Sequence, residues 1–132
     1  MNDEDHIVME WKRLADMDLA TANHMFRTYH PVPVEVVCFH SQQAAEKMLK
    51  CFLVSKGIEP PKIHDLRKLI QMCIEIDDGF NEIFKEATLL TRYAVLPRYP
   101  VEFELIESDG ETAIKHASHV RDYVDVIVTS QI

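Results

Sequence analysis

The residues most suited to bind a ligand lie in one stretch that contains two arginine–tyrosine steps, Arg92-Tyr93 and Arg98-Tyr99. A guanidinium group binds phosphate oxygens in a bidentate manner, and a neighbouring aromatic ring can stack on a base. A structural interpretation competes with this one, because an arginine near a helix end also stabilises the last carbonyl groups while tyrosines pack against the protein. If the stretch binds ligand, the sequence predicts a site for nucleotide or RNA phosphate that comprises Arg92, Arg98, Tyr99, Lys47 and His64.

The other candidate chemistries are weaker. His116 and His119 are three residues apart, but no carboxylate or cysteine stands at i+4 spacing to complete a metal site, so solvated histidines are the favoured interpretation. The three cysteines lie at wide spacing in apolar stretches, which predicts buried reduced thiols without nucleophilic activation. The three glycines are isolated, which excludes the common nucleotide-binding loops. We therefore expect no metal, no cofactor and no catalytic residue.

Composition limits the function further. The chain has 132 residues, of which 47% are hydrophobic, and this predicts a single domain over 1–132. Its formal net charge of −8 excludes a general coating of nucleic acid, because phosphodiester backbones are repelled unless basic residues are concentrated in one place. No apolar run is long enough for a membrane span, and the acidic start at 1–5 is unlike a signal peptide. A cytoplasmic protein without membrane association is predicted.

Apolar residues recur at spacings of three and four along most of the chain, which predicts helices. Pro31 and Pro33 separate the first two, Gly57 ends the second, Asp65 caps the third, and Ser108 with Glu111 has the spacing of a capping box before the last. We find no strand-like alternation of useful length. The predicted fold is an all-α, five-helix up-and-down bundle with helices at 4–28, 34–56, 65–76, 80–93 and 109–129.

The second predicted helix is apolar at nearly every angular position, which indicates a central helix or one that also meets a second subunit. Two polar stripes on this helix follow helical spacing: one is His40, Gln43 and Lys47, and the other is Gln42, Glu46 and Lys50. In the second stripe Glu46 and Lys50 are ordered for an i,i+4 ion pair. We interpret both stripes as a solvated seam. Asp18, on the otherwise apolar face of the first helix, requires a hydrogen-bonding or cationic partner, with Lys47 or Arg92 as candidates.

The run Phe39-His40-Ser41-Gln42-Gln43-Ala44-Ala45-Glu46-Lys47-Met48-Leu49-Lys50, followed by Gly57, resembles the second-helix signature of HEPN domains, the higher-eukaryote-and-prokaryote nucleotide-binding family. Three weaker pieces agree in order: Trp11 with Ala15, Asp18 and Leu19, then His64-Asp65-Leu66, then Arg98-Tyr99-Pro100. The resemblance implies a small helical bundle that usually dimerises and often acts beside a minimal nucleotidyltransferase as a toxin–antitoxin pair. Many members of the family are metal-independent ribonucleases, so the resemblance also implies a search for their motif, an arginine and a histidine separated by four to six residues near the end of the fourth helix.

That ribonuclease spacing is not present here. Counting forward from Arg92 reaches Pro97, Arg98 and Tyr99, and counting from Arg98 reaches 103–105, none of them histidine. The first hypothesis is therefore a homodimeric, partner-binding HEPN-like module, paired with a minimal nucleotidyltransferase, with a degenerate ribonuclease motif. The second is a metal-independent ribonuclease toxin with a rearranged site that uses Arg92, Arg98 and either His64 or Tyr99. The third is a nucleotide-binding accessory domain, and weak binding of RNA or nucleotide is compatible with each.

Overall fold

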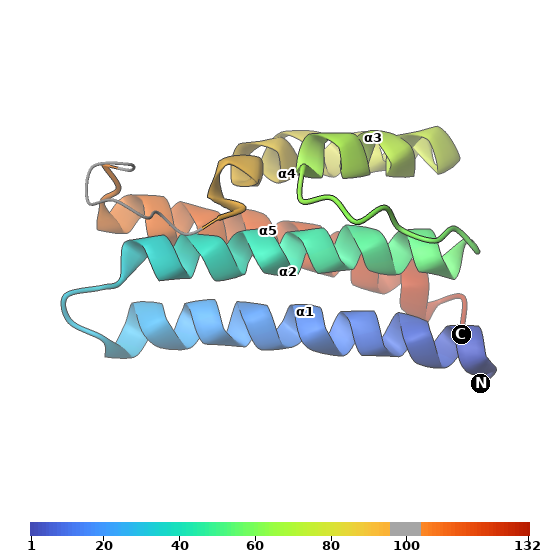
Figure 1. Ribbon diagram of the computed structural model, residues 1–132, viewed down its shortest axis with the longest axis horizontal. Coiled ribbons are helices and arrows are strands. Elements are labelled where there is room, and N and C mark those ends of the chain that lie inside the picture. Colours follow the sequence, from blue (N-terminus) through green and yellow to red (C-terminus); the bar gives the residue numbers. More distant parts are fainter. Residues whose placement is uncertain (96–103) are drawn as a thin grey trace.

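The structure is a computed structural model that describes residues 1–95 and 104–132. Within these residues the chain forms five α-helices and two short 3₁₀ segments, and no strand is found (Figure 1). The predicted all-α fold of five helices is confirmed. The elements are α1 (Asp3–Thr28), α2 (Val34–Ser55), α3 (Leu66–Ile76), η1 (Asp78–Ile83), α4 (Phe84–Leu90), η2 (Thr91–Tyr93) and α5 (Glu107–Thr129).

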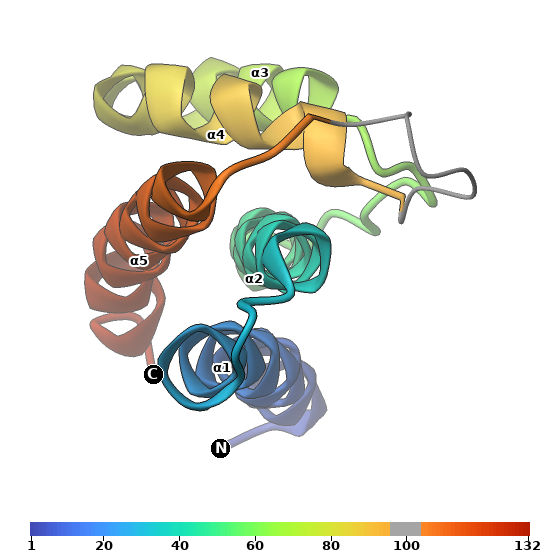
Figure 2. The same ribbon diagram turned by 90° about the vertical axis from the view of Figure 1, so that its left-hand side faces the viewer.

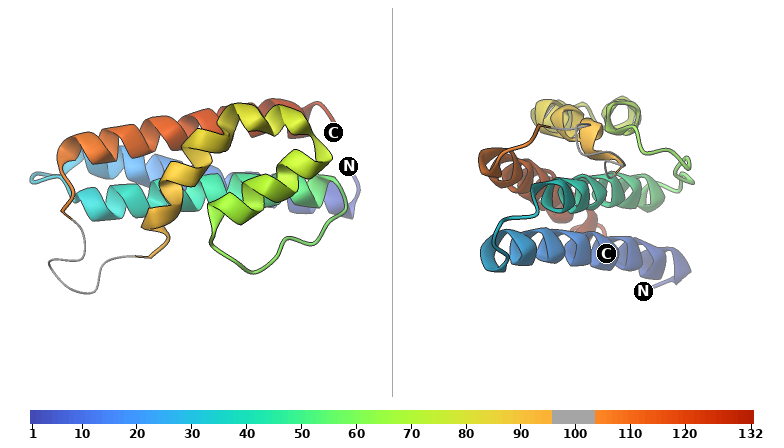
Figure 3. Two further views of the ribbon diagram at one scale, coloured as in Figure 1. Left: turned by 90° about the horizontal axis from the view of Figure 1, so that it is seen from above. Right: turned by 60° about the vertical axis from the view of Figure 1, so that its left-hand side comes forward.

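Helix α2 lies at the centre of the bundle. Viewed along the bundle, α1 lies on one side of α2, α3 and α4 form a layer on the opposite side, and α5 closes a third side (Figure 2). The segment 56–65 returns along α2 before α3 begins, so α3 runs in the same direction as α2 and the predicted up-and-down order does not hold for this pair (Figures 1 and 3). The central position explains why α2 is apolar on several sides, and of the two alternatives left by the sequence the central helix is confirmed.

The ends of α2 and α3 are set by the residues that the sequence indicated. Gly57 has a φ of 75°, which a residue without Cβ adopts at low cost, and its N–H donates to the Val54 carbonyl at 2.9 Å. The Ile58 N–H donates to the Leu53 carbonyl at 3.0 Å, which completes the turn that ends α2. At the start of α3 the Asp65 side chain accepts from the N–H of Arg67 at 2.9 Å. Both predicted signals are confirmed.

The predicted continuous helix over 80–93 is wrong. The chain forms η1, then two turns of α4, then η2. The Asp77 side chain accepts from the Gly79 N–H at 2.9 Å, and the Phe80 N–H donates to the Asp77 carbonyl at 3.1 Å, so the segment starts as a tight i,i+3 helix. In that geometry residues three apart share a face, and Phe80 and Ile83 are both fully buried.

The predicted start of α5 is also wrong. The helix begins at Glu107, two residues early, and the Asp109 carboxylate accepts from the Ile106 N–H at 2.8 Å. The reciprocal side-chain contact predicted for Ser108 and Glu111 is replaced by this one, because Ile106 is the residue that leaves the helical conformation.

The interpretation of the Gln42, Glu46 and Lys50 stripe as a solvated seam is wrong. These side chains belong to residues that are only 0%, 3% and 6% exposed. The returning segment before α3 covers them, and the Gln42 side chain donates to the His64 carbonyl at 3.1 Å. The predicted Glu46–Lys50 pair is confirmed at 3.1 Å, but it lies inside the protein.

Candidate functional site

Arg92 lies in η2, at the end of the α4 segment. Its exposed guanidinium group is stacked over the ring of the adjacent Tyr93, with 5.2 Å between the guanidinium carbon and the ring centroid. Tyr93 is only 8% exposed and packs into the core, as the structural interpretation of the arginine–tyrosine step predicted. The Thr91 hydroxyl accepts from the Leu66 N–H at 3.0 Å, so the start of α3 fixes this segment.

Beside Arg92 is a cavity of about 180 Å³ between the end of α4 and the first turns of α5. Its polar lining comes from two elements far apart in sequence, and an anion that entered it would meet both signs of charge. Asp109 contributes a carboxylate that opposes an anion, so Arg92 has to offset that charge before a phosphate can bind. The polar and charged lining residues include Arg92, Ser108, Asp109, Thr112 and His116.

His116, from α5, is a lining residue that the sequence considered only as a metal ligand. Burial lowers the pKa of its imidazole, although the nearby Glu86 carboxylate acts in the opposite direction. A histidine with a lowered pKa is mostly neutral at pH 7 and is able to accept a proton. The sequence could have indicated this position, because His116 follows the buried Ala113 by three residues and that spacing places it beside the inward stripe of α5.

His119 is not among the residues that line this cavity with His116. Its Nδ1 lies 2.7 Å from a carboxylate oxygen of Glu86 on α4. Among the residues that the structure describes, no group of three or more histidine, cysteine or acidic side chains is arranged to hold a metal ion.

His64 is engaged with the buried polar cluster of α2. Its Nδ1 lies 3.0 Å from Oε1 of Glu46, which also accepts from the Gln42 amide at 3.2 Å. The second carboxylate oxygen of Glu46 accepts from Lys50 at 3.1 Å. The segment that carries His64 leads into α3 near Thr91, but the imidazole itself is directed to Glu46.

Lys47 lies on another side of α2, and its ammonium group donates to Asp18 on α1. The other Asp18 oxygen lies 2.9 Å from Nδ1 of His40. Of the two candidate partners for Asp18, Lys47 and Arg92, the structure shows Lys47. Because α1 and α4 lie on opposite sides of α2, Lys47 is not gathered with Arg92 (Figure 2). The remaining predicted site residues, Arg98 and Tyr99, lie outside the described residues.

Three exposed apolar side chains stand close in sequence to the residues that line the Arg92 cavity. Leu89, Val95 and Ile106, which we call the apolar rim, are 48%, 65% and 65% exposed. Leu89 itself lines the cavity, and Ile106 immediately precedes the first turn of α5. A cation beside exposed apolar groups is a combination that protein interfaces favour.

The cysteines are not candidates for chemistry. Cys38, Cys51 and Cys73 are free and buried, as predicted, and burial raises the pKa of each thiol to about 12. A thiol with such a pKa carries almost no thiolate at pH 7, so it is a poor nucleophile. No helix in the described part of the chain has both the length and the apolar character needed to cross a bilayer.

Comparison with known proteins gives two matches. The family model of the HEPN domain matches residues 8–127. A crystal structure of an archaeal HEPN homologue, ST0689, is similar to this chain with a TM-score of 0.72 and 27% sequence identity, and the match covers 92% of this chain and 97% of that one. A search of curated proteins found no match.

Proposed function

Since the chain belongs to the HEPN domain family, we propose that it is a homodimeric module that binds a partner protein, a minimal nucleotidyltransferase in a toxin–antitoxin pair, and does not cut RNA. The observation that carries this proposal is the composition of the α4–α5 end. An exposed arginine stands there with the apolar rim, while the ribonuclease spacing after Arg92 holds Pro97, Arg98 and Tyr99 in place of a histidine. Such a surface suits protein contact better than proton transfer.

The structure also changes the argument for a dimer. The apolar faces of α2 are covered within one chain, so they no longer require a second subunit. The apolar rim takes their place as the surface on which self-association is expected, because large exposed apolar side chains favour association in water.

Sedimentation at micromolar concentration tests this surface. We expect a species of twice the 15.3 kDa chain mass for the unmodified protein and a single-chain species for Leu89→Glu. Val126→Glu is the matched control, because Val126 is 70% exposed near the other end of α5 and should leave the dimer intact. A single-chain species for the unmodified protein, or a Leu89→Glu variant that still dimerises, would contradict the proposal.

Co-expression with the product of the adjacent reading frame tests the partner. If that frame encodes a minimal nucleotidyltransferase, the two proteins should purify together, and Leu89→Glu should weaken the complex more than Val126→Glu does. An adjacent frame of unrelated type, or a pair that separates during purification, would count against this partner.

One observation favours the second candidate, a ribonuclease with a rearranged site. Arg92 and His116 line the same cavity, and the lowered pKa of His116 leaves a neutral imidazole that can take a 2′-hydroxyl proton while the guanidinium group stabilises charge on the phosphorus oxygens. In this candidate, His116 takes the role of the histidine that the sequence lacks at the expected spacing after Arg92.

Incubation of metal-free protein with labelled single-stranded RNA separates the two candidates. The partner-binding proposal expects no cleavage. Cleavage that is lost in both Arg92→Ala and His116→Ala, but not in His119→Ala, would establish the rearranged ribonuclease instead.

A further inference from the structure

A larger cavity of about 570 Å³ lies between α1, α2 and the segment that follows α2. Its volume is within the range of small-molecule sites, about 300 to 1,000 Å³. Most of its lining is apolar, and each of the three elements contributes to it. The apolar side chains are Ile7 and Trp11 from α1, Val54 from α2, and Ile58, Pro60 and Pro61 from the following segment.

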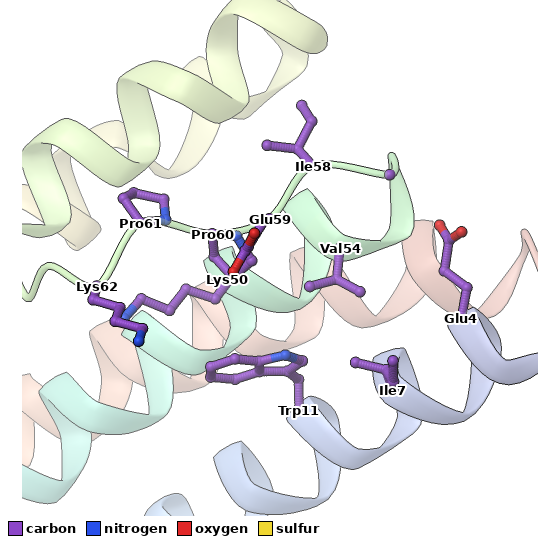
Figure 4. A pocket seen from close by; sticks show the side chains of 11 residues that line it. Glu4, Ile7, Trp11, Lys50, Val54, Ile58, Glu59, Pro60, Pro61 and Lys62 are labelled. Atoms are coloured by element: carbon purple, nitrogen blue, oxygen red, sulfur yellow. The ribbon is translucent and has the colours of Figure 1, made fainter.

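Trp11 provides a flat surface in this cavity. Figure 4 shows its indole ring in the space between α1 and α2, with Val54 on the α2 side and the segment of Pro60 and Pro61 on the far side of the space. The ring is partly buried against the core and remains open to the cavity. Aromatic rings prefer stacked or edge-to-face contacts with other rings, so the surface favours a planar ligand over a flexible chain.

Lys50 supplies a cation at the same place. Residue Lys50 is 6% exposed, and its ammonium group donates to Glu46 at 3.1 Å. An ammonium group has three N–H donors, and the bond to Glu46 uses one of them. Donors that are largely removed from water bind a charged acceptor more strongly than exposed ones do.

The charges of the lining are distributed unevenly. In Figure 4 the side chains of Lys50 and Lys62 end on one side of the Trp11 ring, and Glu4 lies on the other. The lining carboxylates belong to Glu4 and Glu59, which are exposed like Lys62, so water screens them more than it screens Lys50. The Glu46 carboxylate bonded to Lys50 also accepts from Gln42, so its charge is not directed to Lys50 alone. An acidic ligand is therefore complementary to the lysine side of the cavity.

From this arrangement we propose that the cavity binds a small aromatic acid, with its ring against Trp11 and the apolar lining and its acidic group at Lys50 and Lys62. The site lies at the α1–α2 face and is separate from Arg92 and the apolar rim. It does not depend on the function proposed above.

The chain has a single tryptophan, so the indole N–H of Trp11 gives one NMR signal that reports on the cavity. The probe is 2-naphthoate, and 2-naphthalenemethanol is its neutral analogue. We expect a saturable shift of the Trp11 signal with 2-naphthoate and binding about tenfold weaker for the neutral analogue, the size of one charge-assisted hydrogen bond.

Three variants test the assignment of the acid. Lys62→Gln should weaken 2-naphthoate several-fold, and the double variant Glu46→Gln/Lys50→Met, which removes both buried charges together, should reduce the preference for the acid over the alcohol to the part that Lys62 contributes. Lys115→Gln is the control, because it removes an exposed lysine on α5 and should change nothing. No saturable shift, equal binding of both probes, or a loss in Lys115→Gln equal to that in Lys62→Gln would overturn the proposal.

Discussion

At the scale of single residues, the buried pair of Glu46 and Lys50 places strong constraints on its surroundings. Glu46 receives bonds from Gln42 and Lys50 and faces His64, so a carboxylate that is 3% exposed is surrounded by donors. Such a pair stabilises a fold only weakly against apolar residues of the same volume, but losing one partner leaves an uncompensated charge inside the protein.

Lys50→Met is therefore expected to destabilise the protein by about 3 kcal/mol, at the lower end of the usual cost, because the Gln42 amide still donates to Glu46 and Nδ1 of His64 remains 3.0 Å from it. Glu46→Gln/Lys50→Met should recover most of that loss, since the amide keeps hydrogen bonds to its neighbours and no charge is left. Urea unfolding of the three proteins measures the difference. A double variant less stable than the single one would show that the pair is not a coupled unit.

His116 makes stability depend on pH. Because burial holds its pKa in the folded protein below the ordinary 6.5, the unfolded chain takes up a proton first as the pH falls. The contribution of the neutral imidazole is complete above 6.5 and is lost as the pH falls through the folded value. We expect the free energy of unfolding to decrease over this window, and His116→Gln to reduce the decrease. His24→Gln, an exposed histidine on α1, is the control, and an identical decrease in all three proteins would refute the assignment.

At the scale of elements, α5 approaches α2 and the end of α1 at Gly110. A Cβ at this position would lie 3.4 Å from Val37 and 3.6 Å from both Phe26 and Val34. These are ordinary contacts for one methyl group, but they leave no room for a longer side chain.

Gly110→Ala should accordingly be neutral or stabilising by up to about 1 kcal/mol, because alanine favours the helix. Gly110→Leu should destabilise by about 1 to 3 kcal/mol through overpacking. Chemical unfolding of the two variants gives a matched comparison. If both have the same stability, the close approach of α5 to α2 is not as described.

At the scale of the whole molecule, net charge dominates any contact with nucleic acid. A chain with a charge of −8 repels RNA except where arginines are concentrated, and Arg92 with Arg98 is the concentration that the sequence offers. Two phosphate contacts to a single strand correspond to a salt slope of about −1.4, or about −0.7 for each contact.

Any binding of single-stranded RNA should therefore be weak, with log K falling against log salt at about −1.4, and Arg92→Ala should reduce the slope by about 0.7. Fluorescence anisotropy of a labelled RNA over a series of salt concentrations provides the measurement. Arg27→Ala, an exposed arginine on α1, should leave the slope unchanged. A slope several times steeper would indicate a broad basic surface that this model of binding does not include.

The sequence by itself determined the helical class, the need to cover several faces of α2 and the helix ends at Gly57 and Asp65. These properties depend on local chemistry, because apolar periodicity, a φ that favours glycine and a side-chain cap all act within a few residues. The buried thiols and the need of Asp18 for a partner were also predictable, since an unpaired carboxylate on an apolar face is costly, whereas the choice of Lys47 over Arg92 came from the packing of α1 against α2.

Only the tertiary structure decided which polar residues are buried and which of them meet. The stripe of Glu46 and Lys50 has the pattern of a solvated surface, and it is buried because the segment before α3 folds back over it. His116 and Arg92 are 24 residues apart, and no spacing rule along one helix joins them. Burial and proximity of this kind follow from how helices pack against one another, which depends on contacts between residues distant in sequence.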